Sequence, residues 1–112
     1  MKKETRKDQI ILTSAKLFKE KGYAAVTMRD IAKALDMKAA SLYNHISSKQ
    51  DILKIIIISI AEEFTNEMNS IHTSKVSCID KLQQIVALHI DIAYRNSYGM
   101  ASLNNDWMHL EE

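Results

Sequence analysis

One short segment of the chain, residues 38–45 (KAASLYNH), combines small side chains with groups that hydrogen-bond or carry charge. Ser41 supplies a hydroxyl, Asn44 an amide and His45 an imidazole. Such groups pair with base edges and phosphates in nucleic acid complexes. The two alanines before Ser41 let a backbone approach another surface closely. The chemistry that this segment favours is therefore recognition through hydrogen bonds and charge.

The residues around this segment predict a helix-turn-helix. Thr27 and Asp30 are spaced so that the Thr27 hydroxyl can accept a hydrogen bond from the Asp30 N–H, which marks a helix start. The apolar pattern breaks at residues 36–38, and a second short helix is expected over residues 39–45. In this motif the second helix enters the DNA major groove with its first residues against base edges. The alternative is an ordinary corner between two amphipathic helices.

Further characteristic residues are distributed along the first 54 positions of the chain. They are Arg6, Ile10, Ala15, Leu17, Phe18, Lys21-Gly22-Tyr23, Thr27 to Ala32, Leu42 to His45, Ser48, Lys49, Ile52 and Leu53. Together they resemble the DNA-binding domain of TetR-type transcriptional repressors. Such proteins usually carry Gly where Asp36 stands, and Asp tolerates the left-handed turn conformation better than most residues. Met37 and Leu42 are expected to pack inward and set the angle between the two helices.

The resemblance implies a ligand-responsive repressor that binds double-stranded DNA at a palindromic operator, as a homodimer in the complete regulator. The DNA-binding residues that it implies are Thr27, Met28, Arg29, Lys38, Ala39, Ala40, Ser41, Tyr43, Asn44, His45 and Lys49. Of these, the residues expected to hold phosphates are Tyr43, His45 and Lys49, and those expected to approach bases are Arg29, Lys38, Ala39, Ala40, Ser41 and Asn44. Lys49 also falls in the first turn of a helix capped by Ser48, where a cation opposes the helix dipole. A phosphate partner explains this position better than stability does.

Charge is unevenly divided along the chain. Residues 1–54 hold 12 Lys and Arg against 6 Asp and Glu, whereas residues 55–112 hold 3 against 8. A basic half favours a polyanionic partner for that half. The cations near the N-terminus have two interpretations: a basic arm that touches phosphates, or ordinary solubilising charge. They are Lys2, Lys3, Arg6 and Lys7.

Signals for an enzyme, a metal site or a cofactor are missing from the sequence, so none of the three is expected. The four His residues lack metal-ligand spacing, and neither a Gly-rich phosphate loop nor a nucleophile motif is present. The single Cys78 suits a reducing cytoplasm and is expected to be a small buried apolar residue. The charged N-terminus leads into no signal core, and no partner membrane is expected.

The composition predicts an all-α fold, because the chain has no proline and only two glycines. Residues 1–48 are expected to form a three-helix helix-turn-helix DNA-binding domain, with its first helix over residues 4–21. Residues 49–112 are expected to form a long connecting helix and the N-terminal part of an incomplete helical bundle for effector binding and dimerisation. Family members normally continue for several more helices, so we expect either a truncated second domain or a short variant of the family.

Helix boundaries in the second half follow from its apolar pattern. A helix is predicted from Lys49 to about Ile71, apolar on nearly all sides over residues 52–61 and therefore expected to be covered on nearly all sides. A polar connection over residues 72–76 leads to a helix capped by Ser77. The inner stripe expected for that helix is Ile79, Leu82, Ile85, Val86, His89, Ile90 and Ala93. A break at residues 97–99 and a final helix from Met100 into the last two glutamates complete the prediction.

An apolar or aromatic small-molecule effector is the last expectation, again implied by the resemblance. The candidate ligand-binding residues are Phe64, Met68, His89, Tyr94, Met100, Leu103, Trp107 and Met108. Core packing is the default use of residues at this spacing and is the favoured alternative. Two other functions stay open at this point: a helical interaction module without DNA-binding activity, and a small-molecule-binding protein.

Overall fold

The chain folds into six α-helices and two short 3₁₀ turns in a computed structural model that describes residues 4–111. The elements are α1 (Arg6–Lys21), η1 (Tyr23–Ala25), α2 (Met28–Ala34), α3 (Ala39–His45), α4 (Lys49–Thr73), α5 (Cys78–Arg95), α6 (Ser97–Asn105) and η2 (Trp107–His109). The described residues include no strand, and the all-α prediction is confirmed.

Hydroxyl side chains mark four of the helix starts. Thr5, Thr27, Ser48 and Ser77 each accept a hydrogen bond from the N–H three residues on. The predicted starts after Thr27, Ser48 and Ser77 are confirmed, whereas the cap at Thr5 was not predicted. At the other end of α1, Gly22 adopts a φ of 84° and donates its N–H to the Phe18 carbonyl, as a helix stop requires.

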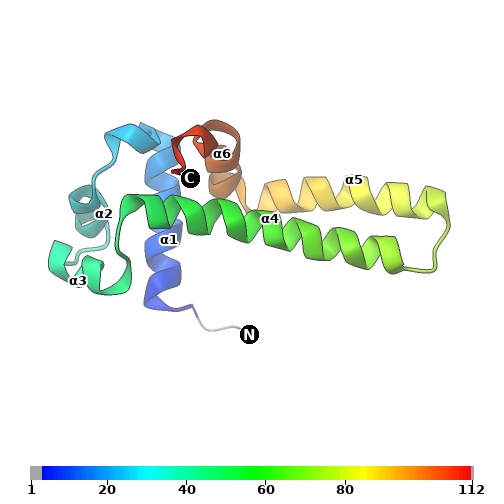
Figure 1. Cartoon of the computed structure of the whole chain (residues 1–112), viewed down its shortest axis with the longest axis horizontal. Helices are drawn as coiled ribbons and strands as arrows, with labels where there is room; N and C mark the ends of the chain where they lie inside the picture. The colour runs from blue at the N-terminus through cyan, green and yellow to red at the C-terminus, as the bar shows by residue number, and fades with distance from the viewer. Residues whose placement is uncertain (1–3, 112) are drawn as a thin grey trace.

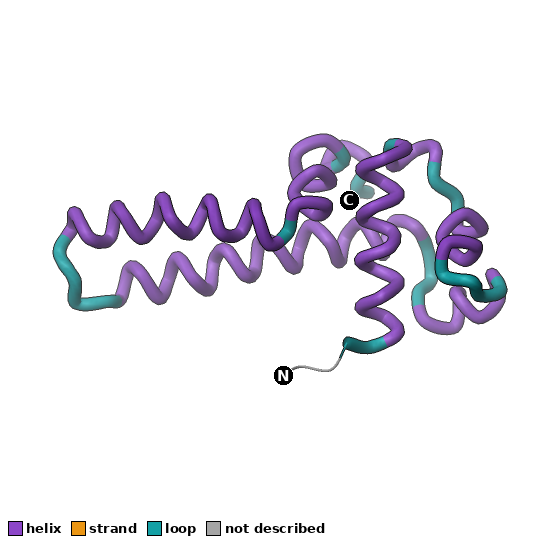
Figure 2. The backbone as a smooth tube through the Cα atoms, turned by 180° about the vertical axis from the view of Figure 1, so that it is seen from behind, coloured by secondary structure: helices purple, strands orange, loops and turns teal. Residues whose placement is uncertain are grey.

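Two parts of the molecule are distinguished in Figures 1 and 2. Helices α1, α2 and α3 gather around the first turns of α4, and we call residues 5–53 the N-terminal unit. The second half of α4 and the antiparallel α5 project away from it, and we call residues 60–95 the hairpin. Helix α6 packs against both α1 and α4, between the two parts.

The hydrophobic core is densest in the N-terminal unit. Its most deeply buried apolar side chains, each at most 2% exposed, are Ile10, Phe18, Val26, Ile31, Leu42, Ile52 and Leu53. Burying side chains of this size contributes roughly 1.5–3 kcal/mol each. Because Ile52 and Leu53 lie in α4, the first turns of that helix share this core. The domain boundary at residue 48 remains a prediction.

Three predicted helix boundaries were wrong. Residues 97–99 are not a break but the first turn of α6, and Gly99 lies so close to α4 that an added Cβ would be 2.5 Å from Ile60 Cδ1. Gly99 therefore serves close helix packing, a role that local sequence does not reveal. The last helix ends at Asn105 and is followed by η2, and α4 continues through Thr73, beyond the predicted start of the connection.

Three burial predictions also failed, all in the hairpin and its base. Cys78, the first residue of α5, is exposed rather than buried. The α5 stripe predicted to face inward is largely exposed: Ile79 is 72% exposed and Val86 57%, and the buried residues are Leu88 and Ile92 instead. Helix α4 is likewise uncovered on one side, where Ile58 is 44% exposed. The reason is that α5 is apolar on two opposite faces, and α4 and α6 pack against only one of them.

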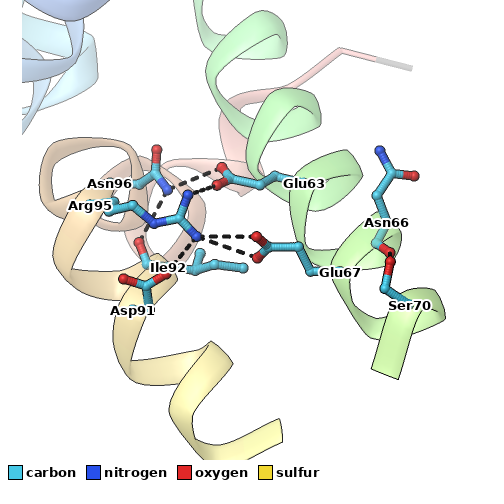
Figure 3. Close-up of polar contacts among 8 residues, drawn as sticks. All are labelled: Glu63, Asn66, Glu67, Ser70, Asp91, Ile92, Arg95 and Asn96. Carbon is cyan, nitrogen blue, oxygen red and sulfur yellow. Dashed lines mark hydrogen bonds and ion pairs between the residues drawn. The ribbon is translucent and has the colours of Figure 1, made fainter. Parts of the chain in front are cut away.

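Polar contacts close the base of the hairpin, as Figure 3 shows. The Arg95 guanidinium lies 2.5 Å from Glu63 and 3.3 Å from Glu67 on α4, and 2.8 Å from Asp91 one turn earlier. Asn96 donates to the Glu63 carboxylate at 3.3 Å. Exposed ion pairs stabilise a fold only weakly, so these contacts orient α5 more than they hold it.

Within residues 4–111, no helix combines the length and apolarity needed to cross a membrane.

Candidate nucleic-acid interface

Helix α2 is fixed at its start by a complete capping box. The Thr27 hydroxyl accepts from the Asp30 N–H at 3.1 Å, and the Asp30 carboxylate accepts from the Thr27 N–H at 2.9 Å. The bond that the Thr27 N–H donates favours the ionised carboxylate and is the main cause of the lowered pKa of Asp30, to which the Thr27 side chain adds. The Thr27 hydroxyl is therefore already engaged within the helix start, although the side chain itself is exposed.

The turn between α2 and α3 has the conformation expected from Asp36. Its φ is 53°, and it is the only residue other than glycine with positive φ among those that the structure describes. The Met37 N–H folds back to the Ala32 carbonyl at 3.0 Å. Met37 is half-buried and Leu42 is fully buried, as predicted, so both ends of the turn are attached to the core. The angle between α2 and α3 is fixed by these contacts.

Most of the predicted DNA-binding side chains are exposed. They are Thr27, Arg29, Lys38, Ala40, Ser41, Tyr43, Asn44 and His45. Met28 and Ala39 are half-buried and pack against the core instead. The exposed hydroxyl, amide and imidazole groups of α3 are free of the core and available to a surface that approaches this helix.

Cations converge where α2 meets α3. Arg29, Lys33, Asp36 and Lys38 line a shallow depression of about 540 Å³ together with apolar residues of the turn. Three cations against one carboxylate favour an anionic partner there. Lys33 was missed in the sequence analysis, although its position one helical turn after Arg29 placed it on the same side of α2.

Lys49 has partners within the protein that the sequence did not predict. Its Nζ donates to the Tyr23 carbonyl at 2.8 Å and lies 4.1 Å from the centroid of the Tyr23 ring. These internal partners stabilise a cation at the helix start, so its position no longer favours a phosphate partner over a contribution to stability. A phosphate contact by Lys49 stays a prediction.

The proposed basic arm is only partly described. Lys2 and Lys3 lie outside the described residues. Arg6 and Lys7 belong to the first turn of α1, and Arg6 hydrogen-bonds Gln9 at 3.0 Å. Lys7 lines a depression of about 410 Å³ whose walls also include His45 and Lys54, and this places cations from α1 and α4 near the end of α3.

The predicted effector residues divide into two groups. Phe64, His89, Met100 and Leu103 line one cavity of about 350 Å³ between α4, α5 and α6, together with Ile60, Ala61, Thr65 and Ile92. The His89 ring meets the Phe64 ring edge-on, with centroids 4.8 Å apart. The other four candidates do not line this cavity: Met68 packs against the core, and Tyr94, Trp107 and Met108 are exposed.

A capped helix, a left-handed turn and a second helix with exposed polar groups define the helix-turn-helix class of DNA-binding proteins. Residues 10–56 match the profile described as "Bacterial regulatory proteins, tetR family". The helix-turn-helix part of the chain therefore belongs to this family.

Relatives of known name support the assignment. The "Biofilm operon icaADBC HTH-type negative transcriptional regulator IcaR" of Staphylococcus epidermidis is 36% identical over 80 residues, which are 71% of this chain and 43% of that protein. The regulator of the same name from Staphylococcus aureus strain Newman is 52% identical over 46 residues, 41% of this chain and 25% of that protein. The chain thus spans less than half the length of these relatives.

Solved structures share the fold over nearly the whole chain. A TetR-family transcriptional regulator from Bordetella parapertussis matches with a TM-score of 0.92 at 22% identity, covering 98% of this chain and 57% of its own. The TetR family regulator PfmR from Thermus thermophilus matches with a TM-score of 0.85 at 27% identity, covering 93% and 57%. The arrangement of helices therefore recurs in regulators that are longer than this chain.

Proposed function

We propose that this chain is the DNA-reading part of a sequence-specific transcriptional repressor, with α3 as its recognition helix. The observation that carries the proposal is the exposure of the α3 polar groups on a helix whose angle is fixed by the core. The basic charge of the same half and the similarity to IcaR, a negative transcriptional regulator, support it. An interaction module without DNA binding is not favoured, because it leaves the exposed cations unexplained.

The residues at and beside α3 have different roles in this proposal. Lys38, Ser41 and Asn44 approach base edges, with Ala39 and Ala40 allowing close approach of the helix. Tyr43, His45 and Lys49 contact phosphates, which position the protein without specifying sequence. Arg29, with Lys33, adds positive charge beside α3. Because one short helix reads few base pairs, two units are required, with recognition helices about 34 Å apart on a palindrome.

Selection from a random duplex pool tests sequence-specific binding. The chain is immobilised, bound duplexes are recovered at about 50 mM salt, where phosphate contacts are strong, and the pool is sequenced. We expect an enriched motif, palindromic when two units bind together. Recovery of unenriched DNA, or of none, would contradict the proposal. Because a transcriptional repressor acts on DNA, we propose that the protein is located in the cytoplasm.

Charge variants test the assigned contacts in the same system. Lys38→Ala and Lys49→Ala are compared with Lys75→Ala, which removes an equal charge from the exposed connection between α4 and α5. Each contact variant should weaken binding and reduce the salt slope by about one unit, whereas Lys75→Ala should leave both unchanged. Equal effects from all three variants would indicate nonspecific attraction to the whole surface.

The cavity between α4, α5 and α6 favours a repressor that responds to a small apolar or aromatic effector. Its volume of about 350 Å³ is at the lower end of the range for small-molecule sites, and Phe64, His89 and Met100 provide aromatic and polarisable walls. Competition of simple aromatic compounds with a fluorescent apolar probe tests occupancy. In a Leu103→Trp variant the larger side chain fills the cavity and should abolish binding of the probe and of the aromatic compounds. If the compounds still displace the probe from this variant, the ligand binds elsewhere.

A further inference from the structure

The Gln50 side chain, in the first turn of α4, makes three hydrogen bonds to two distant segments. Its Nε2 donates to the Tyr23 hydroxyl at 2.9 Å and to the His109 carbonyl at 2.6 Å. Its Oε1 accepts from the Glu111 N–H at 3.2 Å. Both amide protons and the carbonyl oxygen are thus in use, so the orientation of the amide is fixed. We call this set of contacts the Gln50 clasp.

On one side the clasp ends in the core of the N-terminal unit. Tyr23 is buried, and its ring lies edge-on to Phe18 with centroids 5.1 Å apart. Its carbonyl also accepts from Lys49, and η1, to which it belongs, leads directly into the capping box of α2. A shift of Tyr23 would therefore move the start of the helix-turn-helix.

On the other side the clasp ends just beyond α6. The His109 ring stacks on the Tyr23 ring, with centroids 5.2 Å apart and planes 23° from parallel. Six residues earlier, Leu103 lines the cavity between α4, α5 and α6, as does Met100. The cavity wall and the clasped backbone thus belong to one short piece of chain, α6 and η2, which lies near the C-terminus in Figure 1.

We propose that Gln50 is a positioning residue that couples the α6 wall of the cavity to the helix-turn-helix. The coupling runs through η2, the Gln50 amide and Tyr23, in addition to the body of α4. This inference rests on the proposed function, because it concerns how one site of the repressor affects the other. A displacement of α6 opens the clasp and releases Tyr23, whereas a closed clasp holds α2 and α3 in one orientation.

Coupling between two sites is reciprocal, so DNA binding must affect the clasp. Trp107 reports this without an effector, because it is the only tryptophan of the chain, lies in η2 and is 58% exposed. Acrylamide quenching of its fluorescence measures how open η2 is. The variant is Gln50→Ala, and the matched control is Gln84→Ala, at an exposed position of α5.

The first measurement uses no DNA. Gln50→Ala should increase Trp107 quenching by about twofold and speed amide exchange at Val26, whose N–H bonds the Tyr23 carbonyl, by about tenfold. Gln84→Ala should change neither, and thermal unfolding verifies that both variants fold. If Trp107 quenching increases while amide exchange at Val26 is unchanged, the clasp holds η2 but does not affect the helix-turn-helix. That result would overturn the proposal.

The second measurement adds mixed-sequence duplex DNA at low salt, with binding followed separately by the anisotropy of a labelled duplex. In the wild type and in Gln84→Ala, saturation with DNA should reduce Trp107 quenching. In Gln50→Ala, which should bind DNA within about threefold of wild type, Trp107 should no longer respond. A preserved response would assign the coupling to α4 and overturn the proposal. Absence of DNA binding in wild type would reject the proposed function, and the coupling proposal with it, while the Val26 exchange still shows whether a clasp exists.

Discussion

The N-terminal unit and the hairpin use the same types of apolar side chain with opposite results. In the N-terminal unit, Phe18, Ile31 and Leu42 are at most 2% exposed, since three helices and the start of α4 surround them. In the hairpin, Ile79, Leu82 and Ile90 are each more than 60% exposed along one face of α5. Apolar content alone therefore does not tell which part of this chain has a closed core. Exposed apolar patches of this kind mark surfaces that associate.

The largest expected difference between the two parts is in the free energy of unfolding that is lost when one leucine of each is replaced by alanine. Leu42→Ala removes a fully buried side chain and should lower the free energy of unfolding by about 3 kcal/mol. Leu82→Ala removes the same atoms from an exposed position and should change it by less than about 0.5 kcal/mol. Urea unfolding followed by circular dichroism gives both values. A cost for Leu82→Ala close to that of Leu42→Ala would mean that the α5 face is covered in solution.

Association through the hairpin is the second expected effect. Wild-type protein should form larger species as concentration rises, and Leu82→Glu combined with Ile90→Glu should suppress them by placing charge on the apolar face. Sedimentation velocity over a concentration series measures the change. Gln83→Glu together with Gln84→Glu adds the same charge beside that face and serves as the control. A wild type that stays monomeric at high concentration would contradict the prediction.

Lowering the pH should destabilise the N-terminal unit, because it protonates the Asp30 carboxylate. Hydrogen bonds from Thr27 depress its pKa, so the folded state binds this proton less readily than the unfolded state. The stability that this contributes is fully present above the unfolded pKa and is lost as pH falls through the lowered folded pKa. Thr27→Ala should destabilise α2 but keep the Thr27 N–H that donates to Asp30, whereas Asp30→Asn should flatten this part of the pH dependence, measured by urea unfolding between neutral pH and about pH 3. The same pH dependence in Asp30→Asn as in the wild type would show that another carboxylate is responsible.

The smallest effect is expected from the ion pairs at the hairpin base. Arg95→Ala removes contacts to Glu63, Glu67 and Asp91 in an exposed setting, so the unfolding temperature should fall only slightly. About 1 M NaCl should abolish the difference, because the screening length is then about 3 Å. A large fall that persists in high salt would mean that Arg95 acts through packing of its apolar stem.

Much of the candidate DNA site was predictable, because its geometry is local. The Thr27–Asp30 capping box and the positive φ of Asp36 are each set within a few residues, and both were predicted. The lining of the cavity between α4, α5 and α6 was predicted only in part, since it needs three helices to meet. Phe64 and His89 were identified, but Tyr94 and Trp107 were included because aromatic character cannot distinguish a cavity wall from an exposed surface.

The sequence by itself determined the helical class, most helix starts and the turn that sets α3, because capping and periodicity act between residues at most four positions apart. Only the tertiary structure decided which face of α5 is buried and why Gly99 stands inside a helix. It also decided the partners of Lys49 and Gln50, which lie between 26 and 61 positions away in the chain. Contacts at such separations depend on how whole helices pack, and a residue's own neighbours in sequence carry no record of that packing.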